Sequence, residues 1–235
     1  MELYTTHFLC NQAHRTAPAR QFFYTQANWK TAPISLDLGC GTGVITSELT
    51  FSRAQAIGLD INPDLLTQAV MDNLPNNSVH HILADATSLP FRSSVASFVL
   101  SHFTLMWIHN RETALAEVKR ILRPGSLLAA IEPDYTGRIE IPKDTEYTSH
   151  SPIIDYLIFR GADPFIGGKL PFELRSINLT KIQFGTLSWE YNPRTAQTEI
   201  RDEVALLQAK GIHWKPPVFT YTPIFWIIAF KRKIH

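Results

Sequence analysis

Three glycines at alternate positions, Gly39, Gly41 and Gly43, are the residues whose spacing most clearly suggests a chemical role. They follow the apolar run ISLDL (34–38) and precede a helix-like segment. Because glycine lacks a Cβ atom, such a turn lets the backbone approach a ligand closely and adopt positive φ angles. The turn is therefore a candidate nucleotide-binding site, although a G-x-G pattern alone does not identify the nucleotide.

The third glycine separates two kinds of nucleotide-binding turn. The dinucleotide fingerprint is G-x-G-x-x-G, and its third glycine is needed for close packing of the helix on the strand. Counted from Gly39, that position is occupied by Val44, and the glycine comes one residue earlier. A nicotinamide-dependent oxidoreductase is therefore disfavoured.

Three aspartates are expected beside the turn, because each stands at or near the end of a strand-like run. Asp37 precedes the glycines, Asp60 ends the next run at a spacing suited to a ribose diol, and Asp85 ends the third run. Three carboxylates make an acidic pocket, which favours a cationic sulfonium over a doubly negative pyrophosphate. The residues thus predict S-adenosylmethionine as the cofactor.

The elements that must position these residues alternate between strand-like and helix-like runs. Strands are expected over residues 34–38, 54–60, 79–85, 94–103 and 126–133, and helices over 44–51, 62–73 and 111–125. Nearly continuous apolar strands that alternate with helices indicate a parallel sheet with helices on both faces, a doubly wound α/β domain. Such sheets bind ligands beyond the carboxyl ends of their strands, where the glycine turn and the aspartates belong.

The regions outside this core have a different composition. We expect a single domain over residues 1–235, made of a helical segment (1–30), a cofactor-binding core (31–132), an insertion or lid that contacts substrate (133–178) and a C-terminal part that completes the sheet (179–235). Within that last part, two long strands over 179–192 and 218–233 are expected to flank a helix over 195–211.

The overall composition excludes several classes of function. Of the 235 residues 45% are hydrophobic and 18% charged, and a formal net charge of +1 provides no general attraction for nucleic acid or membranes. The apolar run TPIFWIIAF is far shorter than the roughly 20 residues of a membrane helix. Cys10 and Cys40 match no metal or disulfide pattern, and the start has no secretory signal. We therefore expect a cytoplasmic protein with no metal site, nucleic-acid partner or membrane span.

Four segments together resemble a known family, the class I S-adenosylmethionine-dependent methyltransferases, in the branch similar to ubiquinone/menaquinone-biosynthesis methyltransferases. LDLGCGTG, IGLDINPDLL, ADATSLPF and EVKRILRPGSLLAAIEPD stand in the order and spacing of that family, and the resemblance covers residues 34–133. It implies a Rossmann-like seven-stranded sheet, mostly parallel, with an antiparallel last strand. It also implies methyl transfer to O, N or C of a small organic molecule by in-line displacement.

The resemblance assigns roles to individual residues. The cofactor-binding residues it implies are Asp37, Gly39, Gly41, Gly43, Asp60, Ile61, Asp85, Ala86 and Ser101. In this scheme Asp37 and the glycines surround the methionine part, and Asp60 holds the ribose hydroxyls. Ile61, Asp85 and Ala86 would contact the adenine, while Ser101 and His102 would line the methionine end and the entrance for substrate.

Candidates for contact with the acceptor follow from chemistry. Orientation supplies much of the rate of methyl transfer, but a phenol or amine acceptor would gain from a neutral histidine as base. His102 is the first candidate and His109 the second, with a structural hydrogen bond as the alternative for His102. The candidate substrate residues are His102, Trp107, Glu132 and Tyr135, and Arg15 and Arg20 are candidate partners of the cofactor's carboxylate.

Two alternatives stay open. SHFTLMWIHN (101–110) also resembles the fourth-strand region of malonyl carrier-protein carboxyl methyltransferases, so a carrier-bound acyl substrate is possible. The second alternative is a protein that binds S-adenosylmethionine without catalysis. Residues 133–178 match nothing specific, and the sequence therefore identifies neither the acceptor nor the oligomeric state.

Overall fold

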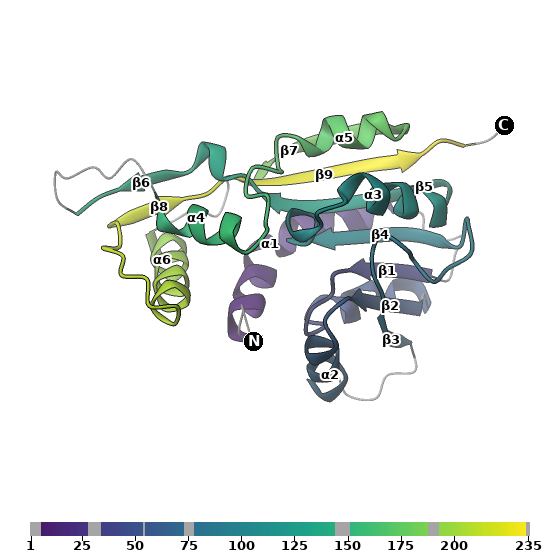
Figure 1. The fold of residues 1–235 in the computed structure, drawn as a ribbon. Coiled ribbons are helices and arrows are strands. Elements are labelled where there is room, and N and C mark those ends of the chain that lie inside the picture. Colours follow the sequence, from purple (N-terminus) through teal and green to yellow (C-terminus); the bar gives the residue numbers. More distant parts are fainter. Residues whose placement is uncertain are drawn as a thin grey trace.

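The central element of the fold is a seven-stranded sheet (Figure 1). The computed structural model describes residues 6–27, 34–53, 55–72, 78–143, 151–187 and 193–233. The strands are β1 (Ile34–Leu38), β2 (Gln55–Asp60), β3 (Val79–Leu83), β4 (Ala96–His102), β5 (Leu122–Pro133), β7 (Leu179–Leu187) and β9 (Ile224–Lys231). They lie in the order β3-β2-β1-β4-β5-β9-β7.

The direction of the strands confirms the expected topology. β1 to β5 pair in parallel, whereas β9, the last strand of the chain, is antiparallel to both of its neighbours, β5 and β7. Because β1, β2 and β4 run the same way, the loops after them meet at one edge of the sheet. That edge is the place where an open α/β sheet binds its ligand.

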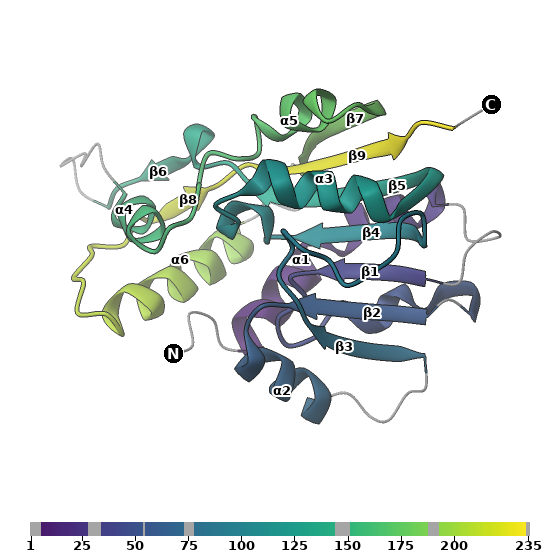
Figure 2. The ribbon, with the colours of Figure 1, turned by 45° about the vertical axis from the view of Figure 1, so that its right-hand side comes forward.

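Helices cover both faces of the sheet, as Figure 2 shows for α3 in front and α1 behind. Along β4, Phe98 and Leu100 pack into one apolar cluster with Phe23 of α1 (Thr6–Gln26). Val99 points to the other face, where it joins the cluster that contains Val118 of α3 (Arg111–Ile121). This alternation is the two-residue period of a strand that is buried on both sides.

Two predicted helices are present, with ends that differ from the expected ones by one to three residues. The helix after β2 is α2 (Pro63–Asp72), and Asn62 caps it by accepting hydrogen bonds from the N–H groups of Asp64 and Leu65. The C-terminal helix expected over 195–211 is α6 (Pro193–Gln208), and α5 (Leu170–Ser176) precedes β7. Of the strand predicted over 179–192, the part over 188–192 lies outside the described residues.

Two local expectations were wrong. Residues 46–53 form a 3-10 helix, η1 (Thr46–Arg53), instead of the expected α-helix. β5 begins at Leu122, directly after α3, and not at residue 126. Its pairing with β4 is irregular there, because the register shifts between the pairs Ala96–Leu122 and Phe98–Leu127. This irregularity accommodates Gly125, whose φ is +81°, inside the strand.

The long strand predicted over 218–233 is in fact two strands. β8 (Phe219–Tyr221) pairs with β6 (Ile139–Ile141) in a separate two-stranded sheet, and β9 belongs to the main sheet. Pro223 lies between β8 and β9, where its missing N–H cannot take part in a ladder. Its carbonyl instead accepts a hydrogen bond from Asp134 N–H.

The segments added to the core gather beyond the carboxyl ends of β1 and β4. Figures 1 and 2 both show α4 (Pro152–Phe159), α6, β6 and β8 at this end of the molecule. In the described part of the chain, no helix is both long and apolar enough to cross a membrane.

Candidate functional site

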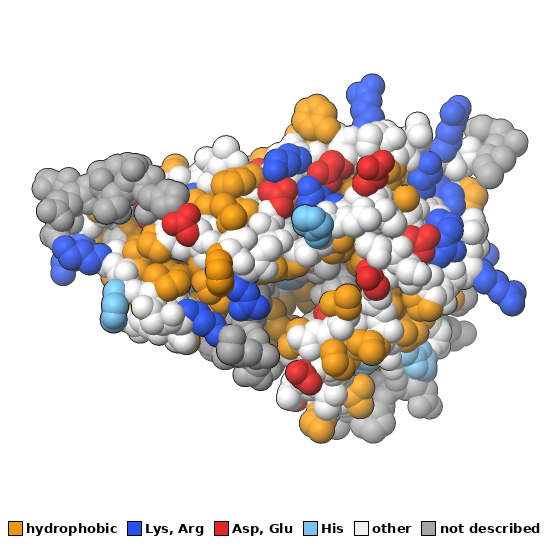
Figure 3. Space-filling view, in the orientation of Figure 1, with side chains coloured by type: hydrophobic (Ala, Val, Ile, Leu, Met, Phe, Trp, Pro, Cys, Tyr) orange, Lys and Arg blue, Asp and Glu red, His pale blue; other side chains and the backbone are white. Residues whose placement is uncertain are grey.

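A cavity of about 900 Å³ opens at the carboxyl edge of the sheet. In Figure 3 the surface is hollowed between the part that carries α2 and the part that carries α4 and α6. Of the predicted site residues, those that line the cavity are Asp37, Gly39, Gly41, Asp60, Ile61, Asp85, Ala86, His102, Trp107 and Tyr135. Gly43, Ser101 and Glu132 are not among the lining residues.

The glycine turn after β1 needs its glycines. Gly39, Gly41 and Gly43 have φ values of +70°, +54° and +74°. A Cβ atom on Gly39 would lie 2.8 Å from the Cβ of Thr104 and still closer to the rest of that side chain. The turn is held by Gly39 N–H and Cys40 N–H, which donate to the carbonyl of Leu59 at 2.7 and 2.9 Å. The backbone is thus fixed in a conformation that only glycine adopts without strain.

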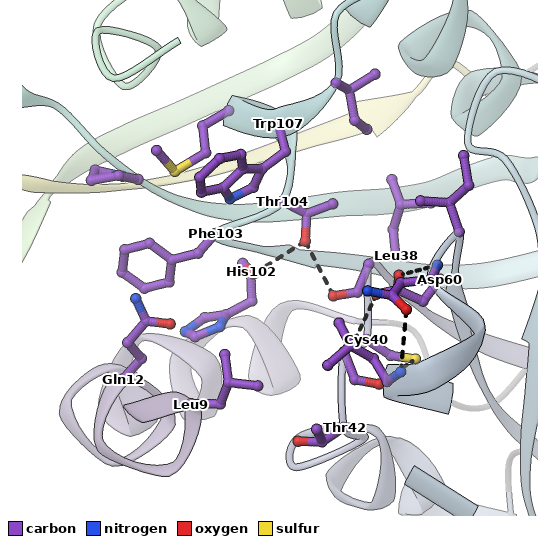
Figure 4. A pocket seen from close by; sticks show the side chains of 18 of the residues that line it. Leu9, Gln12, Leu38, Cys40, Thr42, Asp60, His102, Phe103, Thr104 and Trp107 are labelled. Atoms are coloured by element: carbon purple, nitrogen blue, oxygen red, sulfur yellow. Dashed lines mark hydrogen bonds between the residues drawn. The ribbon is translucent and has the colours of Figure 1, made fainter. Parts of the chain in front are cut away.

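Asp60 joins the glycine turn to the end of β2. Its two carboxylate oxygens accept hydrogen bonds from Gly41 N–H at 2.8 Å and from Asn62 N–H at 2.9 Å (Figure 4). A carboxylate has about four acceptor positions, so these two bonds leave capacity for hydroxyl groups of a ligand. Asp60 both shapes the turn and presents a charge to the cavity.

Asp37 is almost completely buried beneath the turn. Its carboxylate accepts a hydrogen bond from the hydroxyl of Thr46 at 2.7 Å. Burial raises the pKa of Asp37 to about 6, because the charged form loses its hydration. A cationic group in the cavity would restore the preference for the charged form.

The residues after β2 and β3 form an open end of the cavity. Ile61 is 67% exposed there, although its side chain is apolar. Asp85 is exposed, and one of its oxygens accepts hydrogen bonds from the N–H and the hydroxyl of Thr87, both at 2.8 Å. These bonds lower the pKa of Asp85 and keep it ionised. The end thus offers an apolar surface beside a carboxylate, which suits a flat ring with an amino group.

Glu132 and Ser101 lie below the floor of the cavity. Glu132 is fully buried and accepts hydrogen bonds from the N–H groups of Thr104, Leu105 and Met106 at 3.0, 2.7 and 3.4 Å. Ser101 donates a longer bond of 3.4 Å to the same carboxylate. Burial raises the pKa of Glu132 to about 7. The carboxylate therefore fixes the start of the 3-10 helix η2 (Leu105–Trp107), from which Trp107 reaches the cavity.

His102 is tied to α1. Its Nε2 lies 2.7 Å from the hydroxyl of Thr16, which also accepts a hydrogen bond from Arg20. Burial and the nearby charges of Arg20 and Arg15 lower the pKa of His102 well below its ordinary value. The ring is therefore neutral and accepts a proton poorly. The other candidate base, His109, is exposed and also lines the cavity.

The two candidate arginines of α1 differ in position. Arg20 is 2% exposed and does not line the cavity, since its guanidinium donates to both carboxylate oxygens of Glu48 at 2.8 and 2.9 Å. Arg15 lines the cavity and lies 3.4 Å from Glu199 of α6. Within the described part of the chain, its Nε is buried without a hydrogen-bond partner, as is the hydroxyl of Thr42, another lining residue. Such orphaned donors are costly unless a ligand satisfies them.

An ion-pair network that sequence reasoning missed lies beside the cavity, which two of its members, Glu199 and Glu203, line. Arg138 is 2% exposed in its side chain and contacts Glu140, Glu199 and Glu203 at 2.7, 3.5 and 2.6 Å. Its Nη1 also donates to the hydroxyl of Thr222 at 2.6 Å. The available signal was the four-residue spacing of Glu199 and Glu203, which puts both on one face of a helix. Within the described ranges, no group of three or more His, Cys, Asp or Glu residues could hold a metal ion.

Comparison with known proteins identifies the core. Residues 36–130 match the family model described as a methyltransferase domain. The core of this chain is a class I S-adenosylmethionine-dependent methyltransferase domain. The matched residues run from β1 into β5 and include the glycine turn and the three predicted aspartates.

Curated relatives of this methyltransferase domain share its core. The chain is 36% identical over 97 residues to demethylmenaquinone methyltransferase of Mycobacterium tuberculosis, covering 41% of this chain and 39% of that protein. It is 30% identical over 140 residues to trans-aconitate 2-methyltransferase of Deinococcus radiodurans, covering 58% and 48%. The matches thus span less than half the length of these relatives.

Solved structures extend the similarity of the fold beyond the core. Phosphoethanolamine N-methyltransferase 2 of Haemonchus contortus, solved with S-adenosyl-L-methionine, superimposes with a TM-score of 0.66 at 12% identity, covering 98% of this chain and 58% of that one. An S-adenosylmethionine-dependent methyltransferase of Methanosarcina mazei gives a TM-score of 0.57 at 18% identity, covering 91% and 98%. At these identities the likeness concerns the fold alone.

Proposed function

We propose that the protein transfers a methyl group from S-adenosylmethionine to a small organic molecule. The observation that carries this proposal is one cavity lined both by the glycine turn with Asp37, Asp60 and Asp85 and by residues of η2, α4 and α6. We call the part lined by η2, α4, α6 and Tyr135 the second chamber. Small-molecule sites enclose about 300–1,000 Å³, and the volume of about 900 Å³ lies near the upper end of that range.

The residues that line the first part of the cavity suit the cofactor. Asp60 has acceptor capacity for the ribose hydroxyls, and the exposed Ile61 offers an apolar surface for the adenine. Asp85 and Ala86 also line the cavity; in our proposal Asp85 accepts a hydrogen bond from the adenine amino group and Ala86 offers its N–H to the ring.

The methionine end would lie between the glycine turn and α1. Gly41 faces this helix, because a Cβ atom there would be 3.5 Å from Leu9. We assign the cofactor's amino group to Asp37 and its carboxylate to the orphaned donors of Arg15 and Thr42. The cofactor supplies a methyl group bound to a positively charged sulfur, which leaves as the neutral thioether.

The protein's own contribution to the reaction is to exclude water and to orient the acceptor. Holding two reactants in line is worth about 7–11 kcal/mol of the barrier. Trp107 and Tyr135 line the second chamber and would form walls for the acceptor. His102, held by Thr16 and kept neutral, would position α1 against this chamber and not act as a strong base.

The acceptor follows neither from the fold nor from the relatives. The names of the two relatives refer to a demethylmenaquinone and to trans-aconitate, which are different kinds of molecule. We therefore propose a small molecule as the acceptor and assign no methylated atom.

Calorimetry and a turnover assay test the proposal. We expect S-adenosylhomocysteine and S-adenosylmethionine to bind with one site per chain, and NAD not to bind. Methyl transfer from labelled S-adenosylmethionine is then measured over a panel of phenols, amines, carboxylic acids and activated carbon acids. Binding of NAD alone would refute the cofactor, whereas binding of S-adenosylmethionine without turnover on any acceptor would indicate a non-catalytic binding protein.

A further inference from the structure

One cation of the second chamber has no carboxylate partner among the residues that the structure describes. Arg160, the residue that follows α4, is half-buried and lines the cavity. Its only side-chain hydrogen bond among the described residues is to the hydroxyl of Tyr156, at the long distance of 3.4 Å. A half-buried guanidinium gains little from one long bond to a neutral group, so it has donors available for a ligand.

The two glutamates that line this chamber, Glu199 and Glu203, are both paired with Arg138. Glu203 is held by both terminal nitrogens of Arg138, at 2.9 and 2.6 Å. Glu199 accepts from Thr222 at 2.8 Å and lies between Arg138 and Arg15. These carboxylates already have cationic partners, so among the described residues that line this chamber the charge of Arg160 is the one left for a ligand.

Apolar side chains of α4 line the cavity together with Arg160. Ile153, Leu157 and Arg160 all line the cavity, and their spacing of four and then three residues puts them on one side of α4 and its C-terminal end. Leu206 of α6 also lines this chamber, and α4 and α6 pack together. The wall thus presents two apolar side chains followed by one cation.

We propose that Arg160 binds a carboxylate of the methyl acceptor, and that the acceptor has an apolar body with this carboxylate at one end. The inference rests on the proposed function, since it names the class of molecule that occupies the second chamber. A carboxylate matches the planar fork of a guanidinium and can form two parallel hydrogen bonds with it.

The balance of charge distinguishes a carboxylate from other groups. A phosphate dianion would need a second cation, and the other lining arginine, Arg15, is already paired with Glu199 and, by our assignment, with the carboxylate of the cofactor. An ammonium group would be repelled by the positive charge of Arg160, and the nearby carboxylates that could attract it already pair with Arg138. A neutral acceptor would leave Arg160 desolvated without compensation.

The test compares acids with their amides in three forms of the protein. Octanoate, phenylacetate and 4-hydroxybenzoate are each paired with the corresponding amide, and their dissociation constants are measured by calorimetry in the presence of saturating S-adenosylhomocysteine. The forms are the wild type, Arg160→Gln and Arg92→Gln. Arg92 is an exposed arginine outside the cavity, so its substitution removes the same charge at an unrelated place.

We expect the acids to bind at least about tenfold more tightly than the amides in the wild type and in Arg92→Gln, because a charge-assisted bidentate pair is lost in the amides. In Arg160→Gln this preference should disappear, while the affinity for S-adenosylhomocysteine stays the same. Arg160→Lys should restore only part of it, since an ammonium does not form the bidentate pair.

Two results would overturn the inference. One is an acid preference of the same size in Arg160→Gln; the other is no acid preference in the wild type, including the case in which no member of any pair binds. Failure of the proposed function is a separate result, namely no binding of S-adenosylhomocysteine. The acids and amides are then compared on the protein alone, and the same ratio decides the role of Arg160.

Discussion

The two sides of the cavity are built in different ways. The cofactor side comes from the loops after β1, β2 and β3, all within residues 36–86, and relies on glycine backbone and aspartates. The acceptor side brings together α1, η2, α4, α6 and the segment between β8 and β9, which are far apart in the sequence. Its polar contacts are long-range ion pairs such as Arg138–Glu203.

This difference explains which side resembles known proteins. The family model ends at residue 130, before the segments that carry Arg138, Arg160 and Glu203. A turn held by its own backbone and one nearby aspartate depends on few side chains, so a short sequence motif is enough to recognise it. A wall held by ion pairs between distant segments changes whenever one partner changes, which lets the acceptor vary while the methyl donor stays the same.

The largest effect on stability is expected when the guanidinium of Arg138 is removed from the acceptor side. Arg138→Met leaves Glu203 and its neighbours buried without their cation, which should lower the free energy of unfolding by about 3–5 kcal/mol. Urea denaturation measures this loss, and the exposed Arg92→Met should change stability by less than about 0.5 kcal/mol.

A second substitution shows whether the unpaired carboxylates cause the loss. Arg138→Met combined with Glu203→Gln should recover part of the stability, because the amide is less costly to bury than the charge. If Arg138→Met costs less than about 1 kcal/mol, the network behaves like a surface ion pair and does not hold the acceptor side together.

The next largest effect is expected on the cofactor side, at Gly39. Gly39→Ala introduces backbone strain of about 1–3 kcal/mol, and the new methyl group must also displace Thr104. Gly211→Ala is the matched control, because Gly211 has a φ of +72° but nothing within 4 Å of its Cβ position. Both variants should lose stability, whereas only Gly39→Ala should weaken S-adenosylhomocysteine, by about tenfold or more. Equal affinity in the two variants would contradict a close approach of ligand to this turn.

A smaller effect is expected from the carboxylate that joins the turn to β2. Asp60→Ala should weaken S-adenosylhomocysteine by about 1.5 kcal/mol or more, because hydrogen bonds to a charged group are lost. Calorimetry measures the change, with the exposed Asp72→Ala of α2 as control. Unchanged affinity in Asp60→Ala would remove this residue from the site.

The smallest effect is a pH dependence that Asp37 confers on both stability and binding. Its pKa of about 6 in the folded protein is above the ordinary value of 3.8, so its contribution to stability is complete below pH 4 and is lost as the pH rises through 6. Binding of the cofactor's amino group has the opposite trend, since it needs the ionised carboxylate. Affinity for S-adenosylhomocysteine should therefore fall by at most about tenfold per pH unit below pH 6.

Asp37→Asn removes the titrating group and tests this assignment. The variant should flatten the pH dependence of affinity between pH 5 and 7 and should unfold at a higher temperature than the wild type above pH 6 when no ligand is present. If the wild type and Asp37→Asn have the same pH profile, another group governs the binding.

Much of the fold could be predicted because its signals are local. Short apolar runs gave β1 to β4 to within a few residues, and Asn62 followed by Pro63 gave the start of α2. The errors lie where tertiary contacts outweigh local preference. Residues 46–53 form a 3-10 helix whose first residue, Thr46, hydrogen-bonds Asp37, and Pro223 divides one apolar run between two sheets.

The candidate site was predictable to a different degree on each side. The aspartates at 37, 60 and 85 were found because each stands at or near the end of a recognisable strand. Glu132 also follows from its strand, but only its backbone partners reveal that it supports η2 from below the cavity. Arg160 has no motif, so its position depended entirely on where α4 packs.

The sequence by itself determined the cofactor side of the cavity, because the glycine turn and the carboxylates at strand ends are recognisable from residues that are neighbours in the chain. Only the tertiary structure decided the acceptor's side. There, α1 and α6 meet through Arg15 and Glu199, and α4 presents Arg160 to the same cavity. Contacts between such distant segments are set by how the helices pack, and no local pattern records them.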